Sequence, residues 1–584
     1  MDYGAFTVIS LQELNSLPAE QFVTTLGSIF ERSPWVPQRV VGRRPFDSGL
    51  SLHEAMCTAV ELASVDEQLA LIRSHPELAG RAAIRGELTP ESTREQQGAG
   101  LASCTPEEFA RLHQLNADYN AKFGFPFILA VKGHNRASVI AALERRVHNT
   151  IEAERAVAIR EIQRIAGFRL ADSIDEPLGN RVISMAERLA RFSEQADALV
   201  CSYLTPAHLA TAALIRDWML GAGLQVEVDA VGNVIGQWSA QTGSVPTLLT
   251  GSHYDTVIDA GKFDGRLGIL LPIAVAAQLR HAGVRLPYAL KIVAFCEEEG
   301  VRFKSTFLGS RALAGQFDPA VLDNVDADGV SLREAIITAG LDPTAISAAA
   351  VDPRELLGFV EVHIEQGPVL LNEGKPLGVV TSIAGSARFT VTVTGLAGHA
   401  GTVPMNLRRD AAAAAAELVL AVEQCCSGTP GLVGTVGQLQ VPAGAMNVIA
   451  GRCDLSIDIR ADRDEVRNTA VAAVKMQSEG IAARRGVDIH WKQVLEVGSV
   501  PCAPRMQDLW ADSIQRITGE ATARRLPSGA GHDAMVMAGI THMGMLFVRC
   551  GNGGISHHPS ETLSVEDADL AARAFKDFLN NFPV

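Results

Sequence analysis

Two short apolar runs most constrain the fold of this chain, because each leads into residues that can bind a metal ion. Residues 247–250 (Thr-Leu-Leu-Thr) precede Gly-Ser-His-Tyr-Asp at 251–255, and residues 290–295 precede three glutamates, Glu297 to Glu299. Short apolar runs bounded by turn residues are typical of buried parallel strands. Ligand-binding groups in open α/β sheets lie beyond the carboxyl ends of such strands. The pattern predicts such a sheet, with His253 and the glutamates near one edge.

The polar residues around these runs suggest a metal centre. Imidazole and carboxylate groups without thiolates suit zinc, manganese or cobalt. A carboxylate next to a ligand, such as Glu298, can act as the general base of a metallohydrolase. Two further histidines fit the pattern: His363 lies in another apolar strand with a polar end, at 359–368, and His557 lies in a glycine-rich loop after a strand, at 554–561. The candidate ligands are His253, Asp264, Glu299, His363 and His557.

Taken singly, each of these residues has a simpler explanation. A lone buried histidine is more often a hydrogen-bonded core residue than a ligand. Three adjacent glutamates are more often a solvated turn or helix face. Cys296 beside them fits a small buried hydrophobe. The joint pattern favours the metal centre, because each candidate lies at or after the end of an apolar strand.

Composition narrows the class of protein. A chain of 584 residues is expected to form two to four domains, and 47% hydrophobic with 20% charged residues is typical of a soluble globular protein. The net charge of −15 argues against a nucleic-acid partner. We find no run long enough for a membrane span, no secretory signal and no peroxisomal tripeptide. The nine scattered cysteines indicate reduced thiols, so we predict a cytoplasmic location.

The first part of the chain has the periodicity of helices. Apolar residues recur at helical spacing in 11–30, 54–72, 106–123 and 137–165, without a comparable series of apolar strands. Residues 168–174 look like a junction. We therefore predict an all-α domain over residues 1–172.

The remainder alternates between helices and strands, which predicts an α/β domain over 173–383 and 501–584. Helices are expected at 182–191 and 267–283, and a third between the Thr205-Pro206 start signal and Gly221. Strands are expected at 224–228, 234–238 and 543–549. Residues 384–500 predict an inserted α+β domain with strands at 388–393, 434–440 and 453–460 and helices at 410–425 and 466–481.

From about residue 180 onward the chain resembles the metal-dependent amidohydrolases related to aminoacylases and carboxypeptidases. Within them it is similar to the branch of allantoate amidohydrolases and N-carbamoyl-L-amino-acid hydrolases. The matching blocks occur in order over the whole of this region. They are residues 251–257, 261–265, 297–303, 363–368, 398–402, 528–534 and 556–557.

This resemblance implies roles for single residues. His253 and His363 would hold one metal ion, Glu299 and His557 the other, and Asp264 would bridge them, although adjacent His558 could replace His557. Glu298 would be the general base, and Asp255 would orient His253.

The insert would carry a homodimer contact, hence a dimerisation or lid domain. In substrate binding, His399 would stabilise the oxyanion, Gln366 would contact the ureido group, and Asn447 with Arg460 would grip a carboxylate. Without the family, Arg460 could simply form a surface salt bridge.

Three blocks in the first part have both a structural and a functional interpretation. Residues 74–80 (Ser-His-Pro-Glu-Leu-Ala-Gly) could be a helix end stopped by proline. Residues 92–96 could contain a capping box, Ser92 with Glu95, and residues 119–128 could close a helical core. Together with Trp35-Val36 and Arg169, the blocks resemble 2-oxo-4-hydroxy-4-carboxy-5-ureidoimidazoline (OHCU) decarboxylase over residues 5–172.

This second resemblance implies a cofactor-free, all-helical lyase that makes (S)-allantoin. His75 would be catalytic with Glu95 as its partner, and Ser92, Gln96 and Arg169 would bind the substrate with main-chain amides near 125–128. Loss of carbon dioxide leaves charge that the substrate ring can delocalise, so no metal is needed. Histidine is the group in its block with a pKa near neutrality and a proton to give.

The two resemblances together imply an enzyme of purine (ureide) breakdown that acts on OHCU and allantoate, with two divalent metal ions (manganese, zinc or cobalt) in the C-terminal site only. One alternative is an N-carbamoyl-L-amino-acid or ureidoglycolate hydrolase with a decarboxylase-derived first part. Another is that the first part is a non-catalytic helical docking module. We expect a homodimer through residues 384–500, with no nucleic-acid or membrane partner.

Overall fold

The structure is a computed structural model that describes residues 8–78, 105–132, 134–239 and 245–583. The chain divides into two compact units. The first contains residues 1–376, 516–518 and 548–584, and the second contains residues 377–515 and 519–547. The boundaries that the sequence suggests for three domains remain predictions. Among the described residues, no helix combines the length and the apolarity needed to cross a membrane.

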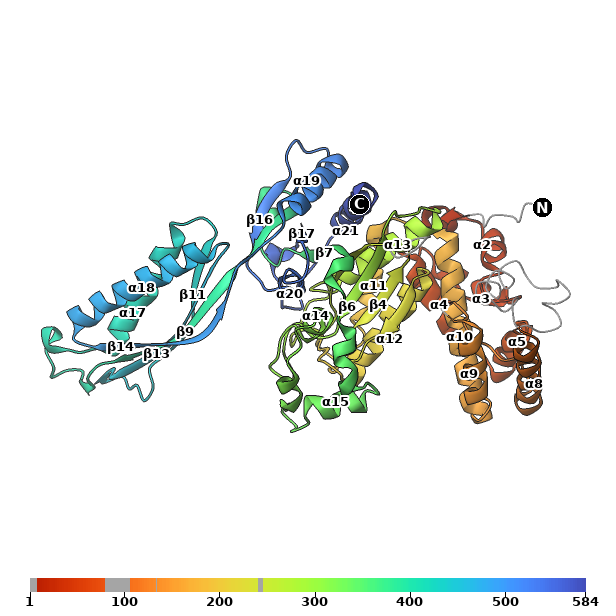
Figure 1. Cartoon of the computed structure of the whole chain (residues 1–584), viewed down its shortest axis with the longest axis horizontal. Coiled ribbons are helices and arrows are strands. Elements are labelled where there is room, and N and C mark those ends of the chain that lie inside the picture. Colours follow the sequence, from red (N-terminus) through yellow and green to blue (C-terminus); the bar gives the residue numbers. More distant parts are fainter. Residues whose placement is uncertain (1–7, 79–104, 133, 240–244, 584) are drawn as a thin grey trace. The chain divides into compact units, whose positions relative to one another are not determined.

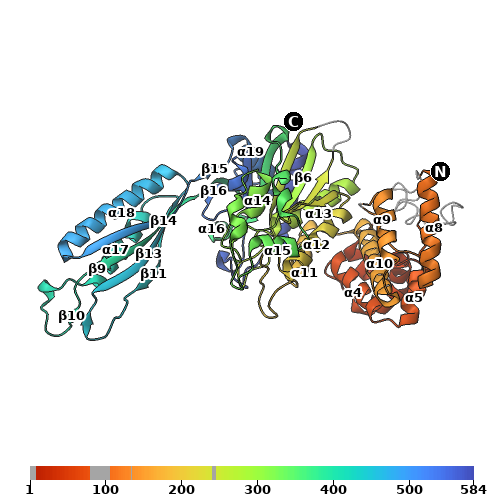
Figure 2. The ribbon, with the colours of Figure 1, turned by 60° about the horizontal axis from the view of Figure 1, so that its bottom comes forward.

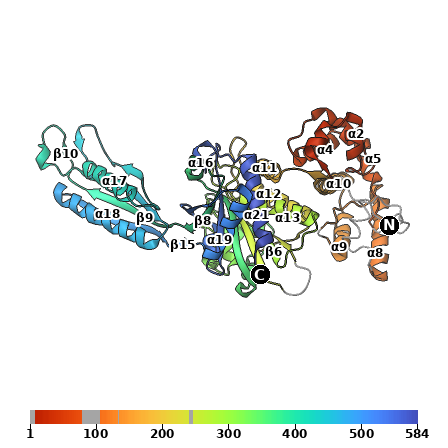
Figure 3. The same cartoon turned by 90° about the horizontal axis from the view of Figure 1, so that it is seen from above.

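The first part of unit 1 is helical, as the sequence predicts (Figure 3). Its buried side chains form one hydrophobic cluster that runs from Leu11 to Ile174. The stretches 11–30, 54–72 and 137–165 each contain parts of two helices instead of one, and in the last of them Thr150 caps a new start after a break at 147–150. The helices here are α1 (Leu11–Ser16), α2 (Ala19–Leu26), α3 (Trp35–Val40), α4 (Gly49–Glu61), α5 (Val65–Ser74), α8 (Pro106–Phe123), α9 (Arg136–Arg146) and α10 (Ile151–Ser173), and the short strands β1 (Ile9–Ser10) and β2 (Ile174–Asp175) pair in parallel.

The rest of unit 1 is built on a mixed sheet with strand order β7-β5-β6-β4-β3. The central strands β5 (Thr247–His253), β6 (Ala289–Phe295) and β7 (Leu356–Ile364) are parallel, as predicted for the two apolar runs. Strands β4 (Val234–Trp238) and β3 (Gln225–Val228) continue the sheet antiparallel. The carboxyl ends of the three parallel strands therefore meet at one edge.

Helices cover this sheet (Figure 2). Helix α12 (Pro206–Gly221) packs on β3 and β4, and α13 (Leu267–His281) packs on β5, β6 and β7. The predicted start of α12 is confirmed, since the Thr205 hydroxyl accepts a hydrogen bond from the His208 amide and Pro206 occupies the first turn. Further helices of unit 1 are α11 (Leu178–Leu189), which packs on α13 and α21, α14 (Leu308–Leu313), α15 (Leu332–Thr338), α16 (Val369–Glu373) and α21 (Val565–Asn581).

Unit 2 contains an antiparallel sheet with the order β11-β13-β9-β14, covered on one face by two helices (Figure 1). Side chains alternate along β13 between buried and more exposed, which is typical of a sheet with one solvated face. The predicted α+β pattern is present, whereas its lid or dimerisation role remains a prediction. The elements are β9 (Gly385–Thr394), α17 (Ala411–Ser427), β11 (Leu432–Gln440), β13 (Arg452–Ala461), α18 (Asp464–Arg485) and β14 (Asp488–Val497).

The other elements of unit 2 include a small antiparallel pair, β10 (Gly398–His399) with β12 (Val448–Ile449). Strand β8 (Leu377–Ile383) pairs with β15 (Val500–Pro501) and β16 (Arg524–Ser528). Helices α19 (Pro504–Thr518) and α20 (Asp533–Met537) and strand β17 (Met543–Val548) complete this part of the chain.

Candidate functional sites

The five predicted metal ligands lie together in unit 1, around the carboxyl ends of its parallel strands. His253 is the last residue of β5, and His363 lies near the end of β7. Ligand atoms within 4.8 Å of one another form one group of His253, Asp264 and His363 and another of Asp264, Glu299 and His557. The two groups share Asp264, so its carboxylate stands where it could bridge two ions. All the donors are nitrogen or oxygen, which fits zinc, manganese or cobalt.

The surroundings of two histidines favour the tautomer that a metal ligand needs. His363 Nδ1 lies 2.9 Å from the Ile364 carbonyl, and His253 Nδ1 lies 3.2 Å from the Asp255 carbonyl. A carbonyl can only accept, so both Nδ1 atoms donate and the Nε2 lone pair is the one that can face a metal ion. At His363 this Nε2 accepts the Gly265 amide at 3.1 Å. A Cβ at Gly265, where φ is +64°, would stand 2.4 Å from His253 Nε2, so glycine keeps that side of the ring open.

Two acidic residues position the loops that carry the ligands. Asp255 accepts the main-chain amides of Glu298 and Glu299, each at 3.1 Å, and lies 3.4 Å from His253 Nδ1. Glu561 accepts the amides of Phe263 at 2.8 Å and Asp264 at 3.2 Å, and its other oxygen accepts the Ser556 hydroxyl at 2.8 Å. Glu561 thus ties the Asp264 loop to the His557 loop. Sequence reasoning missed it, although it lies in the same block as His557.

The electrostatic environment shifts the pKa values of two carboxylates in this cluster in opposite directions. Burial raises the pKa of Asp264, but the hydrogen bond from His557 and the nearby His363 and His253 outweigh this and hold it below its usual range. Burial, together with Asp264 and Asp255, raises the pKa of Glu299 to about 7. The hydrogen bond to Asp264 raises the pKa of His557 to about 8. Without a metal ion, protons therefore occupy part of this site near neutral pH.

Gln366 and His557 complete the rim of the cluster. His557 Nε2 lies 2.9 Å from Asp264 Oδ2, whereas the neighbouring His558 accepts the Ser560 amide through Nδ1 and belongs to no ligand group among the described residues. Gln366 Nε2 donates to Asp264 Oδ1 at 3.0 Å. Gln366 and His557 have positive φ values of 56° and 54°, which are uncommon outside glycine and typical of functional sites.

The predicted substrate-binding residues His399, Asn447 and Arg460 belong to unit 2. His399 is exposed on β10 beside β12, and its Nδ1 accepts the Gly401 amide at 3.0 Å, so the proton is on Nε2. Asn447, also exposed, accepts the Ala400 amide with its main-chain carbonyl at 2.9 Å. Arg460 donates through Nη2 to Asp458 at 2.9 Å and through Nη1 to the Gly529 carbonyl at 2.6 Å.

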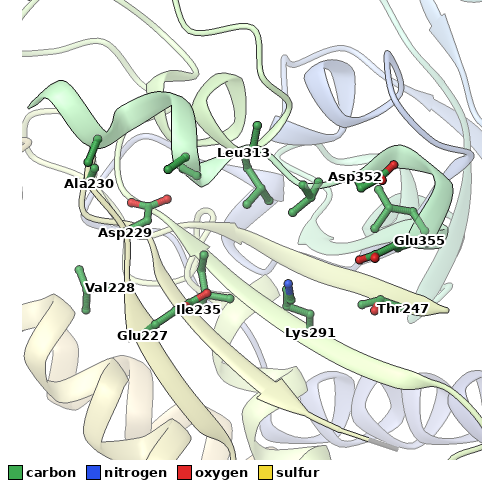
Figure 4. A pocket seen from close by; sticks show the side chains of 16 residues that line it. Glu227, Val228, Asp229, Ala230, Ile235, Thr247, Lys291, Leu313, Asp352 and Glu355 are labelled. Carbon is green, nitrogen blue, oxygen red and sulfur yellow. The ribbon is translucent and has the colours of Figure 1, made fainter. Parts of the chain in front are cut away.

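A cavity of about 440 Å³ also opens in unit 1 (Figure 4). Thr247, Lys291 and Leu356 line it, at the beginning of β5, β6 and β7. It therefore lies at the opposite end of these strands from His253 and the other candidate ligands. The cavity is not the metal centre.

In the helical part, His75 and Arg169 are both buried. His75 caps the carboxyl end of α5, and no described residue makes a hydrogen bond with its Nε2. Burial and the nearby Arg169 lower the pKa of His75 to about 3. The prediction of a pKa near neutrality is therefore wrong, because the imidazole is out of water and beside a cation. His75 is neutral at physiological pH.

Glu31 is a buried residue of this region that sequence reasoning missed. Its carboxylate lies 2.9 Å from Arg169 Nη1, which also donates to the Ser28 carbonyl at 3.1 Å. Glu31 precedes α3 and lies far from Arg169 in the chain, so no local spacing points to the pair. The predicted partners Ser92, Glu95 and Gln96 lie outside the described residues.

Family models match both parts of the chain. Residues 15–171 match the model described as OHCU decarboxylase, and residues 249–581 match that of peptidase family M20/M25/M40. The chain belongs to peptidase family M20/M25/M40. It is thus an enzyme that joins a metal-dependent hydrolase of this family to an OHCU decarboxylase domain.

Related proteins share this hydrolase region. An allantoate deiminase from Arabidopsis thaliana is 38% identical over 433 residues, covering 69% of this chain and 82% of that protein. An N-carbamoyl-L-amino acid amidohydrolase from Geobacillus stearothermophilus is 40% identical over 359 residues, covering 62% of this chain and 87% of that protein. The crystal structure of AtUAH in complex with glyoxylate is similar with a TM-score of 0.55 and 33% identity, covering 69% of this chain and 98% of that one.

Proposed function

We propose that the chain carries out two steps of ureide breakdown, decarboxylation of OHCU to (S)-allantoin and hydrolysis of a ureido C–N bond of allantoate. The observation that carries the hydrolase half is the pair of ligand groups that share Asp264. The match to the OHCU decarboxylase model over residues 15–171 supports the lyase half. That match also favours allantoate, because both substrates then belong to one route.

For the hydrolase, His253 and His363 would hold one divalent ion and Glu299 and His557 the other, with Asp264 between them. Such ions would supply Lewis acidity for attack of water on the ureido carbon. Glu298 is the general base of this proposal, since it adjoins Glu299 and its amide is fixed by Asp255. It takes a proton from the attacking water and passes it to the leaving nitrogen.

The substrate contacts of the proposal follow the family resemblance. His399 carries its proton on Nε2 and can donate to the developing oxyanion. Arg460 and Asn447 would bind a substrate carboxylate, with the guanidinium held by Asp458. Gln366, already hydrogen-bonded to Asp264, would contact the ureido group.

For the lyase, neutral His75 would form a hydrogen bond with the substrate through Nε2, as donor or as acceptor. Arg169 would attract the carboxylate of OHCU. Glu95, Ser92 and Gln96 keep the roles that the family resemblance implies. The alternative of a docking module gains no support from this region, because docking does not require a buried histidine beside a buried arginine.

A second hydrolase substrate class has support of its own. The N-carbamoyl-L-amino acid amidohydrolase is slightly more similar in identity than the allantoate deiminase, and AtUAH binds glyoxylate in its crystal structure. A substrate panel of allantoate, N-carbamoyl-L-amino acids and ureidoglycolate, assayed beside fresh OHCU, tests the proposal. Preference for an N-carbamoyl amino acid or ureidoglycolate would move the hydrolase to that class.

We also propose that residues 384–500 mediate a homodimer. Large apolar side chains with more than half of their surface exposed occur in this segment, and contact with a second copy of the chain would cover them. They include Leu396, Met405, Leu407, Val433, Leu439 and Met446. Light scattering of the whole chain should give twice the 62.1 kDa chain mass. A monomer at micromolar concentration would contradict the dimer.

A further inference from the structure

The resemblance to OHCU decarboxylase implies that main-chain amides near 125–128 bind substrate, and we propose that a buried ion pair, Arg146 with Glu154, positions this row of amides. The inference rests on the lyase half of the proposed function. Both residues are positioning residues, acting on the segment 125–131 through hydrogen bonds and ring contacts. We call this segment the amide segment.

The amide segment contains unusual backbone donors. Phe127, Ile128 and Leu129 are 1%, 3% and 7% exposed, and they belong to no helix or strand. Among the described residues, no acceptor takes a hydrogen bond from their amides, whereas the next amide, that of Ala130, donates to Glu161 at 2.8 Å. Buried backbone N–H groups almost always have a partner. Consecutive buried donors without one suit a ligand with carbonyl or carboxylate oxygens, such as OHCU.

The pair Arg146 and Glu154 is itself deeply buried, with side chains 9% and 0% exposed. Glu154 Oε1 accepts Arg146 Nε at 2.9 Å and Nη2 at 2.6 Å, and also the Tyr119 hydroxyl. Its Oε2 accepts Asn149 Nδ2 at 2.7 Å. Both carboxylate oxygens are therefore engaged, which fixes the guanidinium plane.

Arg146 and Tyr119 both contact the amide segment directly. Arg146 Nη1 donates to the Ile128 carbonyl at 2.8 Å, and the guanidinium lies 4.5 Å from the centre of the Phe127 ring. The Tyr119 ring packs against Phe127 at 5.3 Å and against Phe125 at 6.1 Å between centroids. Carbonyl and ring contacts hold the peptide planes, and the amides of 127–129 have no acceptor among the described residues.

Helix α10 links this support to the rest of the lyase site. It carries Glu161, which accepts the Ala130 amide, and Glu154, which pairs with Arg146. It also carries Arg169, whose guanidinium lies near His75. Arg73, two residues before His75, donates to the Gly124 carbonyl at 3.1 Å, directly before the amide segment. His75 and the amide segment are thus anchored to common elements.

A stability effect and a positioning effect can be separated. A buried ion pair replaced by apolar residues of similar volume is often neutral or stabilising, whereas loss of one partner leaves a buried charge. The double variant R146M/E154L should therefore fold but lose the contact to Ile128. The control R111M/E144L removes an exposed pair of the same domain, whose side chains are 54% and 43% exposed.

The experiment measures decarboxylation, allantoate hydrolysis and thermal unfolding on each whole-chain variant. For R146M/E154L we expect unfolding within a few degrees of the parent. We also expect a fall of about 100-fold in kcat/KM for OHCU, the scale of misplacing a binding group by about 1 Å. The rise in KM should exceed the loss in kcat, and hydrolysis should be unchanged, as should all three readouts in the control.

A folded double variant with kcat/KM within about threefold of the parent would overturn the inference. If the double variant does not fold, R146K keeps the charge but not the forked geometry of the guanidinium. It should lower kcat/KM about tenfold, and an unchanged value would be equally contrary. A parent chain without OHCU decarboxylation would instead refute the proposed lyase function.

Discussion

The two candidate active sites of this chain differ in how burial and neighbouring charges shift the pKa values of their key residues. The hydrolase site concentrates carboxylates and imidazoles at the ends of parallel strands, where burial and neighbouring carboxylates raise the pKa of Glu299 to about 7. The lyase site isolates one histidine in a helical core, where burial and Arg169 lower its pKa to about 3. In the first site, bound cations would balance the negative charge of the clustered carboxylates. In the second, burial and the neighbouring Arg169 keep His75 neutral.

This difference suggests that the two sites respond to different variables. Metal supply and pH should control the hydrolase through its ligands. The lyase should depend on how its buried donors are positioned. The following predictions use that contrast, from the largest expected effect to the smallest.

Removal of divalent metal by chelation should abolish allantoate hydrolysis and leave OHCU decarboxylation unchanged. The reason is that the five clustered ligands belong to the hydrolase site alone. Activity assays on one chelated sample, with manganese, zinc or cobalt added back, check this. Loss of both activities would mean that the sites are not independent.

Glu298→Gln should lower hydrolytic turnover by about 10²–10⁴-fold, the usual range for loss of a general base. Metal content, measured by elemental analysis, should stay at the parental level because the ligands are intact. If Glu298→Gln lost metal while Glu299→Gln retained it, the roles of the two glutamates would be exchanged.

Arg460→Lys should raise KM for allantoate by about tenfold and change kcat less, because lysine cannot form a forked grip on a carboxylate. Steady-state kinetics test this. Arg452→Lys is a matched control, since Arg452 is exposed and pairs with Asp454 on the same strand. An equal effect of both variants would remove Arg460 from the substrate site.

The two sites should also differ in their pH dependence, and this effect should be smaller than the effects of the preceding variants. Metal ions bind deprotonated ligands, and the pKa values of Glu299 and His557 without metal are about 7 and 8. Apparent metal affinity should therefore rise with pH through these values, from about pH 6 to about pH 9. His75 stays neutral far above its pKa of about 3, so it should add no pH dependence to decarboxylation between about pH 5 and 8. Titration calorimetry and a kcat/KM profile are the two measurements, and an inflection from His75 near about pH 6.5 would contradict its depressed pKa.

Local sequence signals predicted much of the fold. Strand β4 has the predicted bounds, and Thr205, Pro206 and Gly221 mark α12 as expected, because capping and proline effects act within one turn. The break between α9 and α10 was missed, since 137–165 keeps an apolar periodicity across the Thr150 cap. The proximity of the five metal ligands could be predicted because parallel strands bring their carboxyl ends to one edge.

Features that depend on burial or on distant pairing could not be predicted. The pair Glu31–Arg169 follows from tertiary packing, and so does the contact of Glu561 with the amide of Asp264. The pKa of His75 depends on how deeply the side chain is buried, which a helix-ending motif does not reveal. Such effects belong to the packed core.

The central claim is that one chain carries two separate active sites, and His75→Ala tests it most directly. Both activities should be measured on one preparation of the whole chain, with the chirality of the allantoin product. The account predicts loss of enzymatic decarboxylation and hydrolysis of allantoate at the parental rate. A His75→Ala variant that still forms a single enantiomer at the parental rate, or that loses hydrolysis as well, would contradict it.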